Sequence, residues 1–212
     1  MKWIAAIVLV VAGFPVAAEY PPEPQVPAGY APELPSGPPH EPPGPPAGLA
    51  DLPLSGTADI SYGAFYRHVR SRNPEIQEHY LRELFEHYHD LASLEGVSLL
   101  VALAQMTHET NYLLFTGSVR AGQFNYAGIG ATSATNPGNT FPDMRTGVAA
   151  HIQHLKAYAN EEPLVTNLVN PRFHLVVRGV APTVHGLTGR WATDPEYGRK
   201  VLEHARRLAG FE

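Results

Sequence analysis

Glu109 ends an apolar stretch of the sequence, and its position suggests acid chemistry. Residues 98–109 read SLLVALAQMTHE, after which the chain enters a segment rich in Gly, Asn, Thr and Ser. A carboxyl group at such a boundary is partly desolvated, which disfavours its charged form and raises its pKa. A glycosidase needs an acid of this kind to protonate the oxygen of a leaving sugar near neutral pH. From spacing alone, a solvated glutamate at a helix end or a salt-bridge partner is the alternative.

A second carboxylate is harder to find. Hydrolysis by two carboxylates needs a partner acid at a separation that fixes the stereochemical outcome. Residues 131–140 contain no acid, and Asp143 is the nearest candidate. In the sequence FPDM, Asp143 is equally well explained as a turn or cap residue. Without it, the acetamido group of the substrate could act instead, or a transglycosylase could use one acid alone.

Several polar and aromatic residues after Glu109 in the sequence are candidate sugar contacts. Aromatic rings could stack on sugar faces, and Asn125 could hydrogen-bond an acetamido group or brace the loop. On base rates, such aromatic residues more often pack in a core or at a rim. The aromatic candidates are Tyr112, Phe124, Tyr126 and Trp191.

The eleven histidines do not form a recognisable metal motif. His108 and Glu109 are not part of an HExxH motif, because residue 112 is tyrosine. His151 and His154 share a helical face, but no third ligand lies at a convincing spacing. We therefore predict neither a metal nor a cofactor. The pair Gly128 and Gly130 lacks the third glycine and the preceding strand of a dinucleotide-binding loop.

Helical periodicity dominates the elements that must position these residues. Apolar residues at spacings of three and four predict an amphipathic helix over residues 75–93, ended by Gly96. Residues 98–109 are apolar nearly all round, as in a central buried helix. Further helices are predicted at 146–158, at 182–187 and from Asp194-Pro195 onward, and residues 112–142 read as a loop with a short hairpin.

The N-terminal quarter differs from the rest of the chain. Residues 1–18 resemble a signal peptide, with Lys2, a short apolar run and a cleavage site ending at Ala18. An uncleaved anchor is the alternative, but the apolar run is shorter than a membrane-spanning helix. Residues 19–54 are predicted to be a disordered spacer, with twelve prolines between Pro21 and Pro46. Residues 55–212 are predicted to form one mainly α domain.

Four motifs, in order, resemble the bacterial glucosaminidase family, the mannosyl-glycoprotein endo-β-N-acetylglucosaminidase-like domains of glycoside hydrolase family 73 type. They are ALAQMTHETNY (102–112), FNYAGIGA (124–131), FPDMRTGVAAHIQHL (141–155) and WATDPEYGRKV (191–201). Gln105 and Glu109 fall on the family's catalytic helix end, and Tyr197 falls on a tyrosine implicated in its active site. The resemblance implies a lysozyme-like fold, in which an α-helical lobe and a small loop or hairpin flap form a substrate cleft.

The resemblance also implies cleavage of peptidoglycan at the β-1,4 bond after N-acetylglucosamine. Glu109 is then the general acid, with Asp143 and Tyr197 as further catalytic residues and Gln105 among the substrate-binding ones. A glycan-binding domain that lost turnover, a single-acid lytic transglycosylase and a protein-interaction domain remain alternatives. We expect a monomer that is secreted or resides in the periplasm or cell envelope, with no stable membrane insertion once the signal is cleaved. The net charge of -5 does not suggest a nucleic-acid partner.

Overall fold

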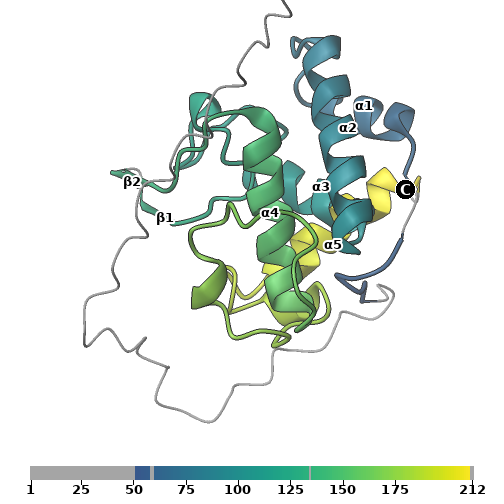
Figure 1. Ribbon diagram of the computed structural model, residues 1–212. Coiled ribbons are helices and arrows are strands. Elements are labelled where there is room, and N and C mark those ends of the chain that lie inside the picture. Colours follow the sequence, from purple (N-terminus) through teal and green to yellow (C-terminus); the bar gives the residue numbers. More distant parts are fainter. Residues whose placement is uncertain (1–50, 58–59, 134, 211–212) are drawn as a thin grey trace, which may run out of the picture. The chain divides into compact units, whose positions relative to one another are not determined.

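The computed structural model describes residues 51–57, 60–133 and 135–210, and the predicted signal peptide and most of the predicted spacer lie outside this part. The described residues form a mainly helical fold with one small antiparallel hairpin (Figure 1). No helix among them has the length and apolarity needed to cross a membrane. In chain order the helices and strands are α1 (Tyr62–Arg70), α2 (Glu78–Glu95), α3 (Leu99–Glu109), β1 (Ala131–Ser133), β2 (Asn136–Pro137), α4 (Met144–Ala159) and α5 (Tyr197–Leu208).

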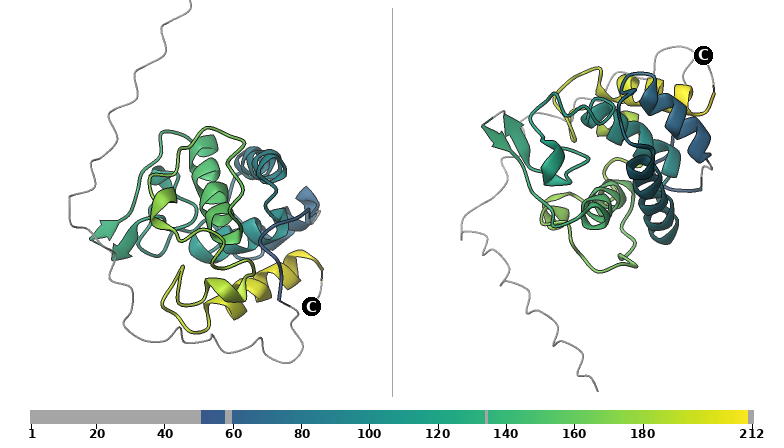
Figure 2. Two further views of the ribbon diagram at one scale, coloured as in Figure 1. Left: turned by 60° about the horizontal axis from the view of Figure 1, so that its bottom comes forward. Right: turned by 90° about the horizontal axis from the view of Figure 1, so that it is seen from above.

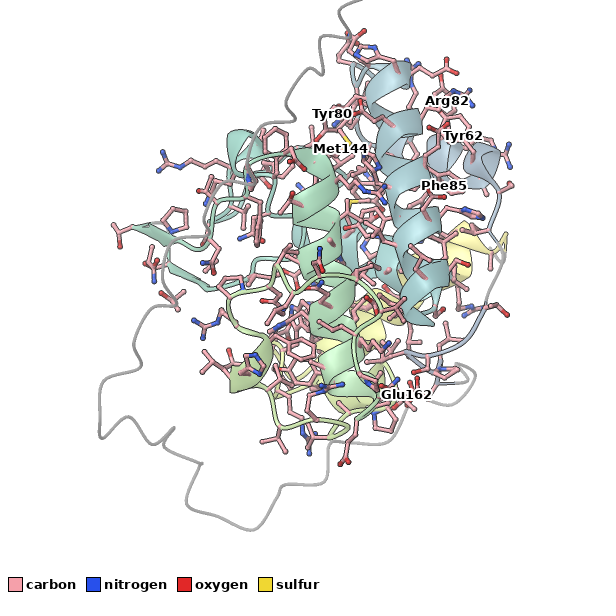
Figure 3. The ribbon with its side chains drawn as sticks, in the orientation of Figure 1. Tyr62, Tyr80, Arg82, Phe85, Met144 and Glu162 are labelled. Atoms are coloured by element: carbon pink, nitrogen blue, oxygen red, sulfur yellow. The ribbon has the colours of Figure 1, made fainter. Side chains whose placement is uncertain are left out.

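Helix α3 is the centre of the core, as its apolar sequence predicts. It packs against α2, α4 and α5, and eight of its eleven residues are buried. In Figure 1, α2 and α4 lie side by side with α3 behind them. Tyr80 of α2 and Met144 at the start of α4 lie between these two helices in Figure 3. The glutamate predicted at the end of α3 is therefore attached to a largely buried helix that contacts three others.

Local signals set the ends of the helices around α3. Gly96 ends α2 in the left-handed region, with φ of 69°, which glycine adopts without steric cost. Ser98 then caps α3 by accepting a hydrogen bond from the backbone N–H of Val101. Asp194 accepts a hydrogen bond from the N–H of Glu196, so it caps the turn before α5, and the helix itself begins at Tyr197. The predicted helix at 182–187 is a single 3-10 turn, His185–Leu187.

The hairpin and its flanking loops form the flap between α3 and α4. Strands β1 and β2 extend to one side of the helices in both views of Figure 2. A small buried cluster of Ala127, Ile129, Phe141 and Ala150 joins the flap to α4. At Gly147 the contact is closest, because a Cβ there would lie 1.8 Å from the carbonyl oxygen of Phe124. Only glycine allows the flap to approach α4 in this way.

The packed structure includes residues that we assigned to the spacer. The Leu54 side chain is fully buried, its N–H donates to the carbonyl of Pro182, and its carbonyl accepts from Ser98. Asp51 accepts a hydrogen bond from the N–H of His185. The boundary predicted at residue 55 is therefore wrong by a few residues, because the segment DLPL lacks the length to show a periodicity of its own.

Candidate active site

Glu109 lies at the last position of α3, and its carboxyl group contacts α5. The hydroxyl of Tyr197, the first residue of α5, donates a hydrogen bond of 2.5 Å to Oε1 of Glu109. Among the described residues, no salt bridge involves Glu109. The structure therefore favours the interpretation of Glu109 as a desolvated acid over that of a salt-bridge partner.

Burial dominates the electrostatics of this carboxyl group. It raises the pKa of Glu109 to about 7, while hydrogen bonding from Tyr197 and then from Trp191 acts to lower that pKa. Burial also raises the pKa of Tyr197 well above its usual value, and the nearby Glu109 raises it further. A neutral phenol thus faces a carboxyl group that is about half protonated at neutral pH.

The other oxygen of Glu109 faces the flap. A Cβ at Gly128 would lie 3.2 Å from Oε2, and Gly128 has φ of 65°. This loop is held by Asn125, whose amide donates to the carbonyls of Ile129 and Asn139 and accepts from the N–H of Ile129. The loop places backbone, with no side chain, directly beside the oxygen that is not bonded to Tyr197.

The backbone after Glu109 turns in an unusual way. Asn111, Tyr112 and Leu113 are consecutive residues with φ between 48° and 62°, in the left-handed region that such residues seldom adopt. The hydroxyl of Thr110 accepts the N–H of Leu113, and the Asn73 side chain donates to the carbonyl of Tyr112. These bonds hold a strained turn that ends α3 immediately after the glutamate.

Behind Tyr197 lies a buried polar network. Nε2 of Gln105 donates to the Tyr197 hydroxyl at 2.7 Å, and Oε1 of Gln105 lies 2.8 Å from Nε2 of His151. Nδ1 of His151 lies 2.7 Å from the hydroxyl of Tyr88. Gln105, His151 and Tyr88 are each fully buried. Helices α2, α3, α4 and α5 therefore all contribute to the support of Glu109.

Four of the predicted sugar contacts are enclosed by protein. Gln105, Asn125 and Tyr126 have no exposed surface, and their polar groups bond to other residues. Tyr112 is also buried, and its ring packs against His68 and His204. These contacts indicate that each of the four side chains supports the fold around Glu109, and a direct contact between them and substrate stays a prediction.

Two predicted contacts keep exposed surface beside the site. Trp191 is partly exposed, packs its ring against His151, His154 and Tyr158, and affects the pKa of Glu109. Phe124 is also partly exposed and sits where the flap meets α4. A sugar-stacking role for these two rings stays a prediction.

Asp143 has a structural role at the start of α4. Its Oδ1 accepts the N–H of Thr146 at 2.7 Å, as an N-cap does. The cap accounts for this aspartate, and its role as a second catalytic carboxylate stays a prediction. Between Glu109 and Glu161 the sequence holds no acidic residue other than Asp143.

The two histidines that share a face of α4 are used elsewhere. His151 belongs to the network behind Tyr197, and Nδ1 of His154 lies 2.8 Å from the amide nitrogen of Asn170. Burial lowers the pKa of His151 to about 3 and that of His154 to about 4. In the part of the chain that the structure describes, no group of three potential ligands could hold a metal ion.

A cavity of about 740 Å³ lies away from Glu109, between α1 and α5. Its lining includes Arg67, Arg206 and Arg207, which belong to the last turns of these two helices. Basic residues there complement the partial negative charge of a helix C-terminus. The two helix ends account for the basic residues of this lining, and the substrate cleft expected beside Glu109 stays a prediction.

Sequence analysis missed Tyr88 and His151 as residues of the site. In the sequence, Tyr88 reads as one apolar position of the helix predicted over residues 75–93, and His151 reads as a possible metal ligand. The available signal was a histidine and a tyrosine on the inward faces of their helices, where a polar atom needs a partner. Their partners could not be assigned, because 46 and 63 residues separate the bonded pairs.

Residues 85–209 match the Glucosaminidase family, described as mannosyl-glycoprotein endo-beta-N-acetylglucosaminidase. Because this match covers more than half of the chain, the protein belongs to that family. Its mainly helical fold with one small hairpin is consistent with a lysozyme-like glucosaminidase domain.

An uncharacterized protein of Borreliella burgdorferi is 46% identical over 129 residues, which make up 61% of this chain. The match spans 63% of the length of that relative. No solved structure matches the chain.

Proposed function

We propose that this protein is a secreted peptidoglycan hydrolase that cleaves the β-1,4 bond after N-acetylglucosamine, with Glu109 as the general acid. The observation that carries the proposal is the carboxyl group of Glu109, which is desolvated, hydrogen-bonded to Tyr197 and half protonated near pH 7. Membership of the glucosaminidase family supports the class of reaction. The signal-like N-terminus supports export, and we expect a monomer.

The chemistry follows from the two oxygens of Glu109. Tyr197 donates to Oε1, so the acidic proton belongs on Oε2. Protonation of the glycosidic oxygen from Oε2 lets the sugar leave as a neutral alcohol while positive charge develops on the ring that is left behind. The Tyr197 hydrogen bond then stabilises the carboxylate that remains.

A reaction with one carboxylate is the second candidate, because Asp143 caps α4 and the flap contains no acid. In that case the acetamido group of the substrate acts on the reacting carbon, or a hydroxyl of the same sugar closes an anhydro product. Mass spectrometry of fragments released from purified peptidoglycan separates the anhydro product from a hydrolysed one, whereas acetamido participation ends in hydrolysis and gives the same mass as the reaction with two carboxylates. A hydrolysed end and an anhydro end differ by the mass of one water.

The variant Glu109→Gln tests the general acid directly. It keeps the size of the side chain and an oxygen that accepts from Tyr197, but it has no proton to transfer. We expect release of reducing ends to fall by at least about a hundredfold without loss of thermal stability. Binding to peptidoglycan with no release of fragments by the wild-type protein would instead support a glycan-binding domain and reject the hydrolase.

A further inference from the structure

Five side chains from four helices form one continuous hydrogen-bonded chain that ends on Glu109. The order is Tyr88, His151, Gln105, Tyr197 and Glu109. Successive polar atoms lie 2.7, 2.8, 2.7 and 2.5 Å apart. The first three residues have no exposed surface and Tyr197 has 2%, so these groups bond to one another within the core.

The hydroxyl and ring N–H groups of this hydrogen-bonded chain all find an acceptor only when they point toward Glu109. The Tyr88 hydroxyl then donates to Nδ1 of His151, and Nε2–H of His151 donates to Oε1 of Gln105. The Gln105 amide donates to the Tyr197 hydroxyl, which donates to Glu109. In the reverse direction the Tyr88 hydroxyl hydrogen would be buried with no acceptor among the described residues, which is costly.

His151 is the residue at which the direction could reverse. Burial keeps it neutral, with a pKa of about 3, so its ring carries a single N–H. If that hydrogen moved to Nδ1, the Gln105 amide would have to rotate and donate to Nε2 of His151. Its oxygen would then accept from Tyr197, and Glu109 would lose its donor. The tautomer of His151 therefore determines which way the Tyr197 hydroxyl points.

We propose that Tyr88 and His151 are positioning residues, in which the Tyr88 hydroxyl holds His151 in the Nε2–H tautomer and so keeps Tyr197 donating to Oε1 of Glu109. The acidic proton is thereby kept on Oε2, the oxygen that faces Gly128. Neither Tyr88 nor His151 touches the sugar, and both act through Gln105 and Tyr197. The inference rests on the proposed role of Glu109 as the general acid.

Few other groups face this chain of hydrogen bonds. His151 also faces His154 on α4 and the Trp191 ring, and His154 in turn faces Arg172. The Tyr88 ring contacts Tyr126 of the flap. The Tyr197 ring faces His108, which lies near Lys200 and Asp194, and the Tyr197 pKa is also affected by Tyr158. Glu109 itself is affected by burial, Tyr197 and Trp191.

Nitrogen-15 NMR of the wild-type protein tests the tautomer without any substitution. We expect His151, assigned through its contact with the Tyr88 ring, to carry hydrogen on Nε2 and none on Nδ1. An Nδ1–H tautomer would overturn the proposal. This measurement is decisive even where a variant in the network fails to fold.

The variant Tyr88→Phe tests the consequence for Glu109. It removes the hydroxyl and keeps the ring. The matched control is Tyr80→Phe, because Tyr80 is another tyrosine of α2 and its hydroxyl bonds to Tyr126, outside this hydrogen-bonded chain. Carbon-13 titration of the Glu109 carboxyl should give a pKa raised by roughly half a unit or more in Tyr88→Phe, since a donor to the carboxylate is lost. Tyr80→Phe should leave it unchanged.

Kinetics give a second measurement that packing alone would not move. In Tyr88→Phe we expect kcat to fall roughly tenfold with KM unchanged, and the basic limb of the pH profile to shift upward with the Glu109 pKa. A pKa and pH profile equal to those of Tyr80→Phe would reduce Tyr88 to a packing role and overturn the proposal. If the wild type releases no sugar but Tyr88→Phe still shifts the Glu109 pKa, the positioning chain stands and the proposed reaction fails.

Discussion

The fold raises the pKa of the Glu109 carboxyl group above the ordinary value of a carboxyl group. Burial beneath the flap raises its pKa to about 7, although hydrogen bonding from Tyr197 and Trp191 acts to lower that pKa. The acid form is needed for catalysis, so we expect kcat/KM to fall above about pH 7, with the slope that the loss of one proton gives. Initial rates on solubilised peptidoglycan at limiting substrate would measure this decrease. A profile that stays flat up to pH 9 would contradict the assignment.

The raised pKa of Glu109 also affects the free energy of unfolding. Because the folded pKa of about 7 lies above the ordinary value of 4.5, the folded state binds this proton more tightly than the unfolded state. Stability from Glu109 is therefore complete below about pH 4.5 and is lost as the pH rises through 7. Glu109→Gln should be more stable than wild type at pH 8, by up to about 3 kcal/mol, and similar at pH 4. Urea unfolding of both proteins would show a smaller difference, or its reversal, if the carboxyl were solvated.

At the scale of elements, the flap depends on one amide. Asn125 donates to the carbonyls of Ile129 and Asn139 on opposite sides of the loop that faces Glu109. Asn125→Asp replaces both donors with a charged acceptor, so we expect a loss of about 2 kcal/mol in unfolding free energy and at least a tenfold loss of kcat/KM. Asn136→Asp is the matched control, because Asn136 is an exposed residue of β2. Equal effects of the two substitutions would show that Asn125 has no special role.

Local elements could be predicted from the sequence, whereas the contacts between them could not. Gly96 and Ser98 mark the ends of α2 and α3 because caps involve residues within one turn. Gln105 and Tyr197 are bonded across 92 residues, and no periodicity relates them. The resemblance placed both near the active site, but it did not indicate that Gln105 donates a hydrogen bond to Tyr197.

At the scale of the whole molecule, the core contains more polar groups than the hydrophobic pattern implies. Lys156 of α4 donates to Glu95 at the end of α2 at 2.9 Å, and both side chains are buried. Glu95 also accepts the N–H groups of Val165 and Thr166, so the pair anchors the segment after α4. Hydrophobic periodicity could not reveal this pair, because a charged residue within a helix is ordinarily a solvated one.

From the pKa values of the buried histidines we predict how the stability of the whole fold changes at acid pH. Burial lowers the pKa of His68 and His154 to about 4, and that of His151 and His204 to about 3. The unfolded chain binds these protons near pH 6.5, so stability is complete above that pH and is lost as the pH falls toward 4. Glu109 acts in the opposite direction between pH 4.5 and 7, but four histidines outweigh one glutamate.

Urea unfolding at pH 7, 5.5 and 4.5 would measure this loss of stability at acid pH. We expect the loss to reach several kcal/mol at the lowest pH, since one unit of pKa shift corresponds to about 1.4 kcal/mol. His204→Gln should flatten the dependence, because His204 and His68 are bonded to each other and titrate as one pair. His79→Gln, at an exposed position of α2, should leave the slope unchanged. A stability that is constant from pH 7 to 4.5 would mean that these rings accept protons without unfolding. The four rings would then take up protons as readily in the folded protein as in the unfolded chain, which is contrary to the lowering of their pKa by burial.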